Sequence, residues 1–513
     1  MNGKLKHALA CATCVLLLAG CVSPIRERAP SESPAQDILV EFEAPAADAI
    51  ADRAMQAALY FLTPDGSQLR AFATEVAVRG GESEAEAVLR VLLSGSAPQG
   101  LRPPLPGGLL QTDRTPVIVA GGVATVMLSP AARTLEPGEL FAARMAIANT
   151  LTELPSISYV NVLVEGMEAG IAPGSNVPFG TLARQPNADV DAAWRHQQAL
   201  LENVDHQGFS KLITVYVPVP GGRYIIPQVR NVTFADAQAT TLIRGVLWEI
   251  SKGAAGATGA DQAPALPDLN YYLYGEPEEL MLADGFTRVI RFTFYDAIGE
   301  ELANCGVSRG MLCALLTQSV TSLLPHVRGV QVRIGIDALI DLGEAESPDG
   351  RPLSASGDMW TPAHFWDSVG ALASIPLPNH SGARLVKVDR PVRATERLRP
   401  RALLGQLLLG PQPADARQDL LPALPPGVSD EDFLAISLQD GVALVNLSAR
   451  FAQACRDLNE WEERNAVYAI VNLLTEFSDV RRVAFFVEGA QVRSLAGGLE
   501  MRGVFYRNPG LFE

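Results

Sequence analysis

The chain has 513 residues, with 41 Lys or Arg against 57 Asp or Glu, so its formal net charge is −16. This acidity argues against nucleic acid as a partner, because phosphate backbones are bound through clustered basic side chains. The length suggests roughly three domains, each large enough to bury a core without disulfides.

The N-terminal residues have the order of a secretory signal. Lys4 and Lys6 precede an apolar run, residues 8–18, that is too short to span a bilayer. Residues 18–21, Leu-Ala-Gly-Cys, then match the lipobox of bacterial lipoproteins, in which small residues fit the peptidase and the thiol accepts the lipid. We predict cleavage of residues 1–20 and acylation of Cys21. The alternative is an ordinary signal peptide, or an uncleaved anchor with a chance cysteine.

The lipid is the expected membrane attachment. Loss of the two signal lysines changes the formal net charge to −18, and no later segment has the roughly eighteen uninterrupted apolar residues of a membrane span. Residues 22–50 are rich in Pro, Ala, Ser and Glu, which is typical of a flexible tether. The mature protein is therefore expected to be extracytoplasmic and held at the cell membrane.

The rest of the chain contains a repeated unit. Residues 122–129 recur as residues 441–448, with six of eight positions identical. The motif Asn-x-Leu-Thr-Glu follows at 149–153 and again at 472–476, and in each copy a glycine stands seventeen residues after the asparagine. Equal spacing after equal motifs indicates duplication.

Each copy is predicted to begin with a helix and a Pro-rich corner. Ser83 and Glu86 form a capping box before an apolar stripe at 85–93, and Pro400 stands in a first helical turn before the leucines of 403–408. The corners that follow are residues 101–106 and 421–426. Extended segments are predicted before the first of these helices, at 58–62 and 72–78.

A second helix and a strand complete the unit. The helices, 140–154 and 466–477, each carry one apolar side, and the strands, 160–164 and 483–487, alternate apolar residues. Helices with one apolar face and a sheet with one buried face can bury these faces against each other, which gives a two-layer sandwich. The fold class is therefore α+β. The other face of the sheet is expected to be solvated or to receive a partner.

A degenerate copy is predicted in the middle of the chain. Its parts are an extended segment at 212–219, a helix at 242–250, a corner at 263–267, a strand at 286–294, a second helix at 311–324 and a strand at 330–334. The sequence thus predicts tandem two-layer α/β sandwiches, two of them clear and one degenerate.

These motifs together resemble the GerMN domain of the bacterial sporulation and spore-germination family. The family pattern has a helix ending in a Leu-Leu-x-Gly-Pro-like turn, a glycine-led strand closing in Leu-Ser, and a helix ending in a Leu-Thr-Glu-Leu-like run. In this chain the turn is at 92–95 and 407–411, the strand at 122–129 and 441–448, and the helix end at 151–154 and 474–477. The tail at 507–510 is also similar to the end of such domains. The resemblance implies a non-enzymatic envelope lipoprotein, folded like the ring-building domains of secretion-type complexes, without catalytic residues or cofactor.

The predicted organisation departs from the usual two-domain arrangement of that family by a third copy and an insertion. In the middle copy, Ser322 and Leu323 replace the Thr and Glu of the family run. The expected parts are residues 1–20 (lipoprotein signal peptide), 21–50 (tether), 51–185 (first GerMN-like domain), 205–343 (degenerate second domain), 344–378 (insertion or linker) and 379–513 (third domain).

Residues 306–310, Gly-Val-Ser-Arg-Gly, formally match the nucleophile elbow of serine hydrolases. That elbow needs a buried strand directly before the serine, whereas residues 300–304 are polar. Ser308 stands instead where the N-cap of the following apolar helix is expected. We therefore predict no catalytic residue.

The polar residues of 186–204 and their neighbours do not predict a metal site. His196 and His206 lie ten apart in a polar stretch, and Asp189 and Asp191 lack the glycine and terminal glutamate of a calcium loop. All four are expected to be exposed linker residues, and no metal or cofactor is predicted.

Two further groups are open to more than one interpretation. Cys305 and Cys313 could pair across a short loop or remain buried thiols. The aromatic residues of the insertion, Trp360, Phe365 and Trp366, favour a local packing cluster over a partner surface.

The sequence therefore predicts a non-catalytic envelope lipoprotein whose tandem domains bind other proteins of a multiprotein assembly, in sporulation or spore germination. A solute-binding lipoprotein of a transporter is the first alternative, but such receptors have two unlike lobes and this chain repeats one unit. A secreted serine hydrolase built on Ser308 is the second. The partner and the stage of action stay open.

Overall fold

The structure is a computed structural model, and it describes most of the chain that follows the predicted tether. The described residues are 42–109, 117–185, 189–219, 223–253, 266–335, 346–348, 350–353, 359–413, 415 and 419–513. Cys21 and most of the predicted corner 263–267 lie outside them. Residues 42–513 form one compact part of the chain.

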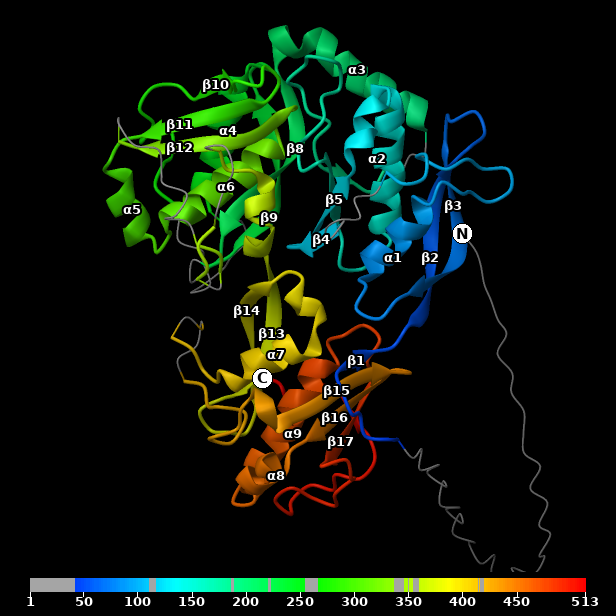
Figure 1. Cartoon of the computed structure of the whole chain (residues 1–513), viewed down its shortest axis with the longest axis vertical. Helices are drawn as coiled ribbons and strands as arrows, with labels where there is room; N and C mark the ends of the chain where they lie inside the picture. Colours follow the sequence, from blue (N-terminus) through cyan, green and yellow to red (C-terminus); the bar gives the residue numbers. More distant parts are fainter. Residues whose placement is uncertain are drawn as a thin grey trace, which may run out of the picture. The chain divides into compact units, whose positions relative to one another are not determined.

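Three consecutive units repeat one order of elements: hairpin, helix, antiparallel strand pair, long helix and parallel strand (Figure 1). The first unit comprises β2 (Arg53–Leu62), β3 (Leu69–Val78), α1 (Glu84–Leu92), β4 (Val117–Ala120), β5 (Val123–Leu128), α2 (Pro137–Leu151), β6 (Tyr159–Val164) and β7 (Leu182–Ala183). The middle unit comprises β8 (Phe209–Pro218), β9 (Ile225–Phe234), α4 (Ala239–Ser251), β10 (Glu278–Met281), β11 (Arg288–Phe294), α5 (Ile298–Asn304), α6 (Arg309–Thr321) and β12 (Val327–Ile334). The third unit comprises β13 (Gly370–Pro378), β14 (Leu385–Arg393), α7 (Pro400–Leu408), β15 (Phe433–Gln439), β16 (Val442–Leu447), α8 (Ala449–Cys455), α9 (Glu460–Leu474), β17 (Arg482–Val487) and β18 (Phe505–Tyr506).

The duplicated sequence motifs take the same register in the first and third units. Val123 of β5 stands opposite Tyr159 of the parallel strand β6, and Val442, the repeat of Val123, stands opposite Arg482 of β17. In the middle unit β11 is likewise antiparallel to β10 and parallel to β12. The degenerate copy therefore has the topology of the two clear ones, and the predicted α+β class is confirmed.

The predicted helix starts are confirmed by their capping contacts. Ser83 Oγ accepts from the backbone N of Glu86 at 3.1 Å, while the Glu86 carboxylate accepts from the backbone N of Ser83 at 2.9 Å. Pro400 occupies the first turn of α7, where its missing N–H costs no helical hydrogen bond. Asn459 begins α9 with a second capping box.

Each long helix lies between the hairpin and the sheet of its own unit. In the first unit α2 packs on β2 on one side and on β6 on the other. Polar residues of α2 are buried as a result, among them Arg144 and Asn149, which are 0% and 1% exposed. The prediction of one apolar side was therefore incomplete, because the hairpin covers a second side of the helix.

The first and middle units share one hydrophobic core, whereas the third unit has a core of its own. The helix α6 of the middle unit is buried on every side, including its polar residues Thr317 and Ser319. The backbone N of Glu168, just after β6, donates to the carbonyl oxygen of Thr321 at 2.8 Å. The outer face of the first sheet thus receives the middle unit and is not solvated.

Two elements lie in segments that were expected to be irregular. The helix α3 (Val190–Gln207) occupies the predicted linker between the first two units. The strand β13 lies within the predicted insertion, and its Ile375 and Leu377 are 0% exposed in the third core. Burial of these two side chains makes β13 part of the third unit.

Candidate functional site

The first described residues, 42–51, lie along the sheet of the third unit, and we call them the N-terminal segment. Its strand β1 (Ala49–Ile50) pairs in parallel with β15, with Ile50 opposite Leu438. It protects the edge of β15, which would otherwise present unpaired backbone groups. The predicted tether from Cys21 was expected to extend to residue 50. Its last nine residues instead belong to the folded part of the chain, and two of them, Ala49 and Ile50, pair with the third sheet. Their attachment is the candidate functional site.

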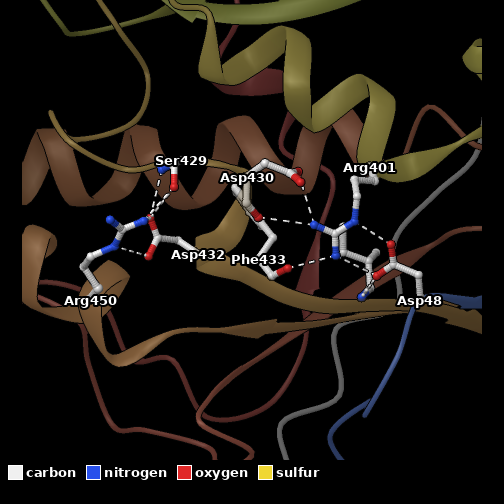
Figure 2. A network of polar contacts seen from close by, with 8 residues as sticks. Asp48, Arg401, Ser429, Asp430, Asp432, Phe433 and Arg450 are labelled. Carbon is white, nitrogen blue, oxygen red and sulfur yellow. Dashed lines mark hydrogen bonds and ion pairs between the residues drawn. The ribbon is translucent and has the colours of Figure 1, made fainter.

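An arginine of α7 holds the segment in place. Arg401 Nη2 donates to Asp48 Oδ1 at 2.8 Å and to the Phe433 carbonyl oxygen at 2.8 Å, and Nη1 donates to Asp430 Oδ1 at 3.2 Å (Figure 2). Asp48 Oδ1 also accepts from the backbone N of Ile436 at 2.9 Å. The hydrogen bond from Arg401 lowers the pKa of Asp48, against partial burial that raises it. Asp48 is therefore ionised and paired at neutral pH.

A second carboxylate, that of Asp432, holds the turn that leads into β15. Asp432 is 1% exposed and accepts from Arg450 Nη2 at 2.7 Å and from the backbone N of Ser429 at 2.8 Å (Figure 2). It also accepts from Ser448 Oγ at 2.6 Å. Burial raises the pKa of Asp432, but these donors outweigh burial and hold the pKa well below its usual range. The turn that leads into β15 is thus positioned by two arginine–carboxylate pairs.

Apolar contacts complete the attachment. Phe42 and Ala44 pack over a small cluster on the outer face of the third sheet that includes Leu444 and Phe486, which are 1% and 2% exposed. The carbonyl oxygen of Pro45 accepts from Asn446 Nδ2 at 3.3 Å. In the third unit, therefore, the outer sheet face receives the chain's own N-terminal segment.

The serine motif is a helix cap. Ser308 is the N-cap of α6, and its Oγ accepts from the backbone N of Met311 at 3.1 Å, which confirms the predicted cap. The helix α5 precedes it, where a nucleophile elbow requires a strand. Ser308 also lines a cavity of about 290 Å³ with Arg223, and no histidine is among the described residues of that lining. The geometry is not that of a Ser-His pair.

The residues considered for metal binding lie on α3. Asp189 is its N-cap and accepts from the backbone N of Ala192 at 2.8 Å, and Asp191 stands in its first turn. The prediction of a linker was wrong here, because these residues start a helix. His196 is exposed on the same helix, and His206 has no described side chain. Within the described ranges, no group of three or more His, Cys, Asp or Glu is arranged to hold a metal ion.

The aromatic residues of the insertion form a packing cluster, as predicted. Trp360 and Phe365 are each 1% exposed, and their ring centroids lie 5.2 Å apart. The backbone of Trp360 bridges to Val330 of β12, which attaches this segment to the middle unit. Cys313 is buried and Cys305 is partly exposed.

Comparison with known families identifies two of the three units. Residues 58–170 and 377–493 match the Germane family, described as sporulation and spore germination. The chain contains two Germane domains. They coincide with the first and third units, so the predicted resemblance to GerMN domains is confirmed. A search of the curated proteins finds no match.

Solved structures that are similar to the chain include Germane-type proteins. The tandem GerMN domains of the sporulation protein GerM from Bacillus subtilis are 18% identical, covering 60% of this chain and 99% of that one, with a TM-score of 0.22. The first GerMN domain of GerM is 20% identical and covers 26% and 96%, with a TM-score of 0.20. A candidate lipoprotein from Clostridium perfringens is 20% identical and covers 25% and 82%, with a TM-score of 0.19. Among the described helices of this chain, none has the length and apolar character needed to cross a membrane.

Sequence reasoning missed α3 and a buried group of charges beside it. Apolar residues recur along α3 at helical spacing, at Val190, Ala193, Leu200 and Val204, and this periodicity could have predicted the helix. Arg144, Glu168 and Lys211 are 0%, 2% and 7% exposed. No pattern in the sequence indicated their burial, because each comes from a different element and charged residues are rarely buried.

Proposed function

We propose that the protein is a non-enzymatic lipoprotein of the cell envelope, anchored through Cys21, that acts in sporulation or spore germination by binding other proteins of an envelope assembly. The observation that carries this proposal is the pair of Germane domains at residues 58–170 and 377–493. The lipobox that precedes them supports the anchor, and the N-terminal segment, which follows in sequence, pairs with the sheet of the third unit.

The arrangement suits an interaction protein. Confinement to one membrane raises the effective concentration of each unit toward partners on the same surface, so several modest contacts can act together. The pairing of β1 with β15 and the Asp48–Arg401 contact would hold the third unit close to the end of the tether. The first and middle units share one core, so partner proteins would meet their surfaces as one continuous surface.

In-membrane crosslinking in the native host tests the proposal. We expect the wild-type protein to crosslink to the same set of envelope proteins in repeated preparations, at the stage when spores form or germinate. Cys21→Ser should lose these adducts and the associated phenotype. Ser308→Ala is the matched control, because it removes the serine hydroxyl and leaves the anchor and both Germane domains intact.

The control separates this proposal from the hydrolase alternative. We expect Ser308→Ala to retain the adducts and the phenotype. Loss of the phenotype in Ser308→Ala at wild-type abundance and localisation would overturn the proposal in favour of a serine hydrolase. Wild-type phenotype in an unanchored Cys21→Ser protein would overturn the role of the anchor.

A further inference from the structure

A cavity of about 460 Å³ lies between α3, the strand β7 and the start of β8, where the first unit passes into the middle unit. One side is apolar and includes Phe141, Phe179 and Leu200, and Lys211 also lines it. Small ligands are usually bound in cavities of about 300 to 1,000 Å³ with mostly apolar walls and few polar groups. The volume lies within this range, and an apolar wall faces polar groups that could orient a ligand.

Lys211 is a buried cation whose Nζ hydrogen-bonds only neutral groups, although the Glu168 carboxylate is near enough to favour its charge. It is 7% exposed, and its Nζ donates to Gln197 Oε1 and to the Phe179 carbonyl oxygen at 3.4 Å, both of which are neutral. No ion pair within 4.0 Å joins Lys211 to a carboxylate of the described residues. Burial lowers its pKa to about 8, which shows the cost of holding this charge away from water.

The neighbouring carboxylate, that of Glu168, forms an ion pair with Arg144. Glu168 Oε1 lies 3.1 Å from Arg144 Nη1, and both side chains are buried, with the Arg144 guanidinium 5.0 Å from the centroid of the Phe179 ring. Burial raises the pKa of Glu168 to about 7, so this carboxylate is partly protonated at neutral pH and does not balance both Arg144 and Lys211. Asp189 also lines the cavity, but its carboxylate caps α3. The group therefore lacks one anion.

We propose that this cavity binds a small organic monocarboxylate, whose carboxylate pairs with Lys211 and whose apolar body packs against Phe141 and Phe179. A single ammonium matches a single negative charge. The two rings lie 5.9 Å apart at their centroids and Trp194 packs on both, so the apolar wall is rigid and aromatic. This function is additional to the proposed envelope interactions and does not depend on them.

Lysine labelling of the detergent-solubilised full chain provides a direct test, because Lys211, Lys252 and Lys387 are the three lysines after the predicted signal. An amine-selective reagent and peptide mass spectrometry would follow each one, with 4-phenylbutyrate, octanoate and benzoate as probes. We expect at least one probe to slow labelling of Lys211 about tenfold, while Lys252 and Lys387, whose side chains are each 48% exposed, are unaffected. The neutral amide of that probe should not protect.

Lys211→Met gives the matched binding measurement. It fills the same space without charge, and we expect it to weaken carboxylate binding about tenfold or more by calorimetry, while Lys252→Met leaves binding unchanged. Inorganic phosphate should protect weakly, since it has no apolar body. Equal protection by phosphate, or equal binding of acid and amide, would overturn the assigned ligand class. Absence of protection by every carboxylate at millimolar concentration would overturn the site itself.

Discussion

Asp48 and Arg401 stand 353 positions apart in the sequence, and Arg401 Nη2 donates to Asp48 Oδ1 at 2.8 Å. This contact joins the last part of the predicted tether to the first helix of the second Germane domain. The start of the described chain and its third unit are therefore held together by an arginine–carboxylate pair.

Asp48→Asn should loosen the N-terminal segment without unfolding the third unit. The pair is partly exposed, at 44% for Asp48 and 31% for Arg401, so its loss should cost only about 0.5–1 kcal/mol. Hydrogen exchange should show faster amide exchange at residues 49–51. Glu500→Gln is the control, because it removes an exposed local pair with Arg502 and should leave residues 49–51 unchanged. Identical exchange in Asp48→Asn would contradict the role of this contact.

Asp432 should make the stability of the third unit dependent on pH. Its pKa is lower in the folded than in the unfolded state, so its contribution is present above about pH 4 and is lost as pH falls through the folded-state pKa. Asp432→Asn should reduce the free energy of unfolding at pH 7 by about 2–3 kcal/mol, measured by urea denaturation. The difference from wild type should shrink below pH 4. Glu431→Gln at the exposed neighbouring position is the control and should change the free energy of unfolding by less than about 0.5 kcal/mol. A loss of unfolding free energy in Asp432→Asn that does not vary with pH would contradict this explanation.

Cys21→Ser should move the protein from the membrane fraction to the soluble fraction, or leave its signal uncut. The serine hydroxyl is too weak a nucleophile to accept the lipid. The substitution lies outside the folded residues 42–513 and leaves their sequence unchanged. Fractionation followed by mass spectrometry of the N-terminus measures both outcomes. A mature wild-type N-terminus other than acylated Cys21 would be incompatible with the lipobox prediction.

The third unit should fold alone when its hairpin is complete. A fragment of residues 370–513 contains every fully buried residue of the third core and lacks only the N-terminal segment, so it should unfold cooperatively in calorimetry. A fragment of residues 381–513 lacks β13, and the loss of buried Ile375 and Leu377 should cost several kcal/mol, at about 2–5 kcal/mol for each. Leu474→Asp in the longer fragment should abolish the transition, because Leu474 is 0% exposed. Equal stability of both fragments would show that β13 is dispensable.

The first unit should not behave in the same way. Its outer sheet face packs on the middle unit, so a fragment of residues 53–185 would expose buried side chains such as Met127 and Leu163, which are 3% and 0% exposed. We expect this fragment to aggregate or to unfold at lower temperature than a fragment of residues 53–335, measured by calorimetry and light scattering. A cooperative, monomeric fragment 53–185 of equal stability would contradict the shared core.

The sequence by itself determined the repeated unit and its local chemistry. The duplicated motifs predicted the positions of β5 and β16, and the structure places both in one register because identical apolar alternation selects identical pairing. Ser83 and Ser308 were predictable as helix caps, since the capping bond lies within three residues of the serine. The lipobox is likewise a local pattern that needs no folded context.

Only the tertiary structure decided where distant segments meet. The strand β1 has two residues and no periodicity of its own, so its pairing with β15 depends on a sheet edge almost 400 residues away. Lys211 and Arg144 carry the charge typical of surface residues, and their burial follows from the junction of two units and not from their own neighbours in sequence. Local patterns specify local hydrogen bonds and faces, whereas docking of units depends on shape and charge that only the assembled fold brings together.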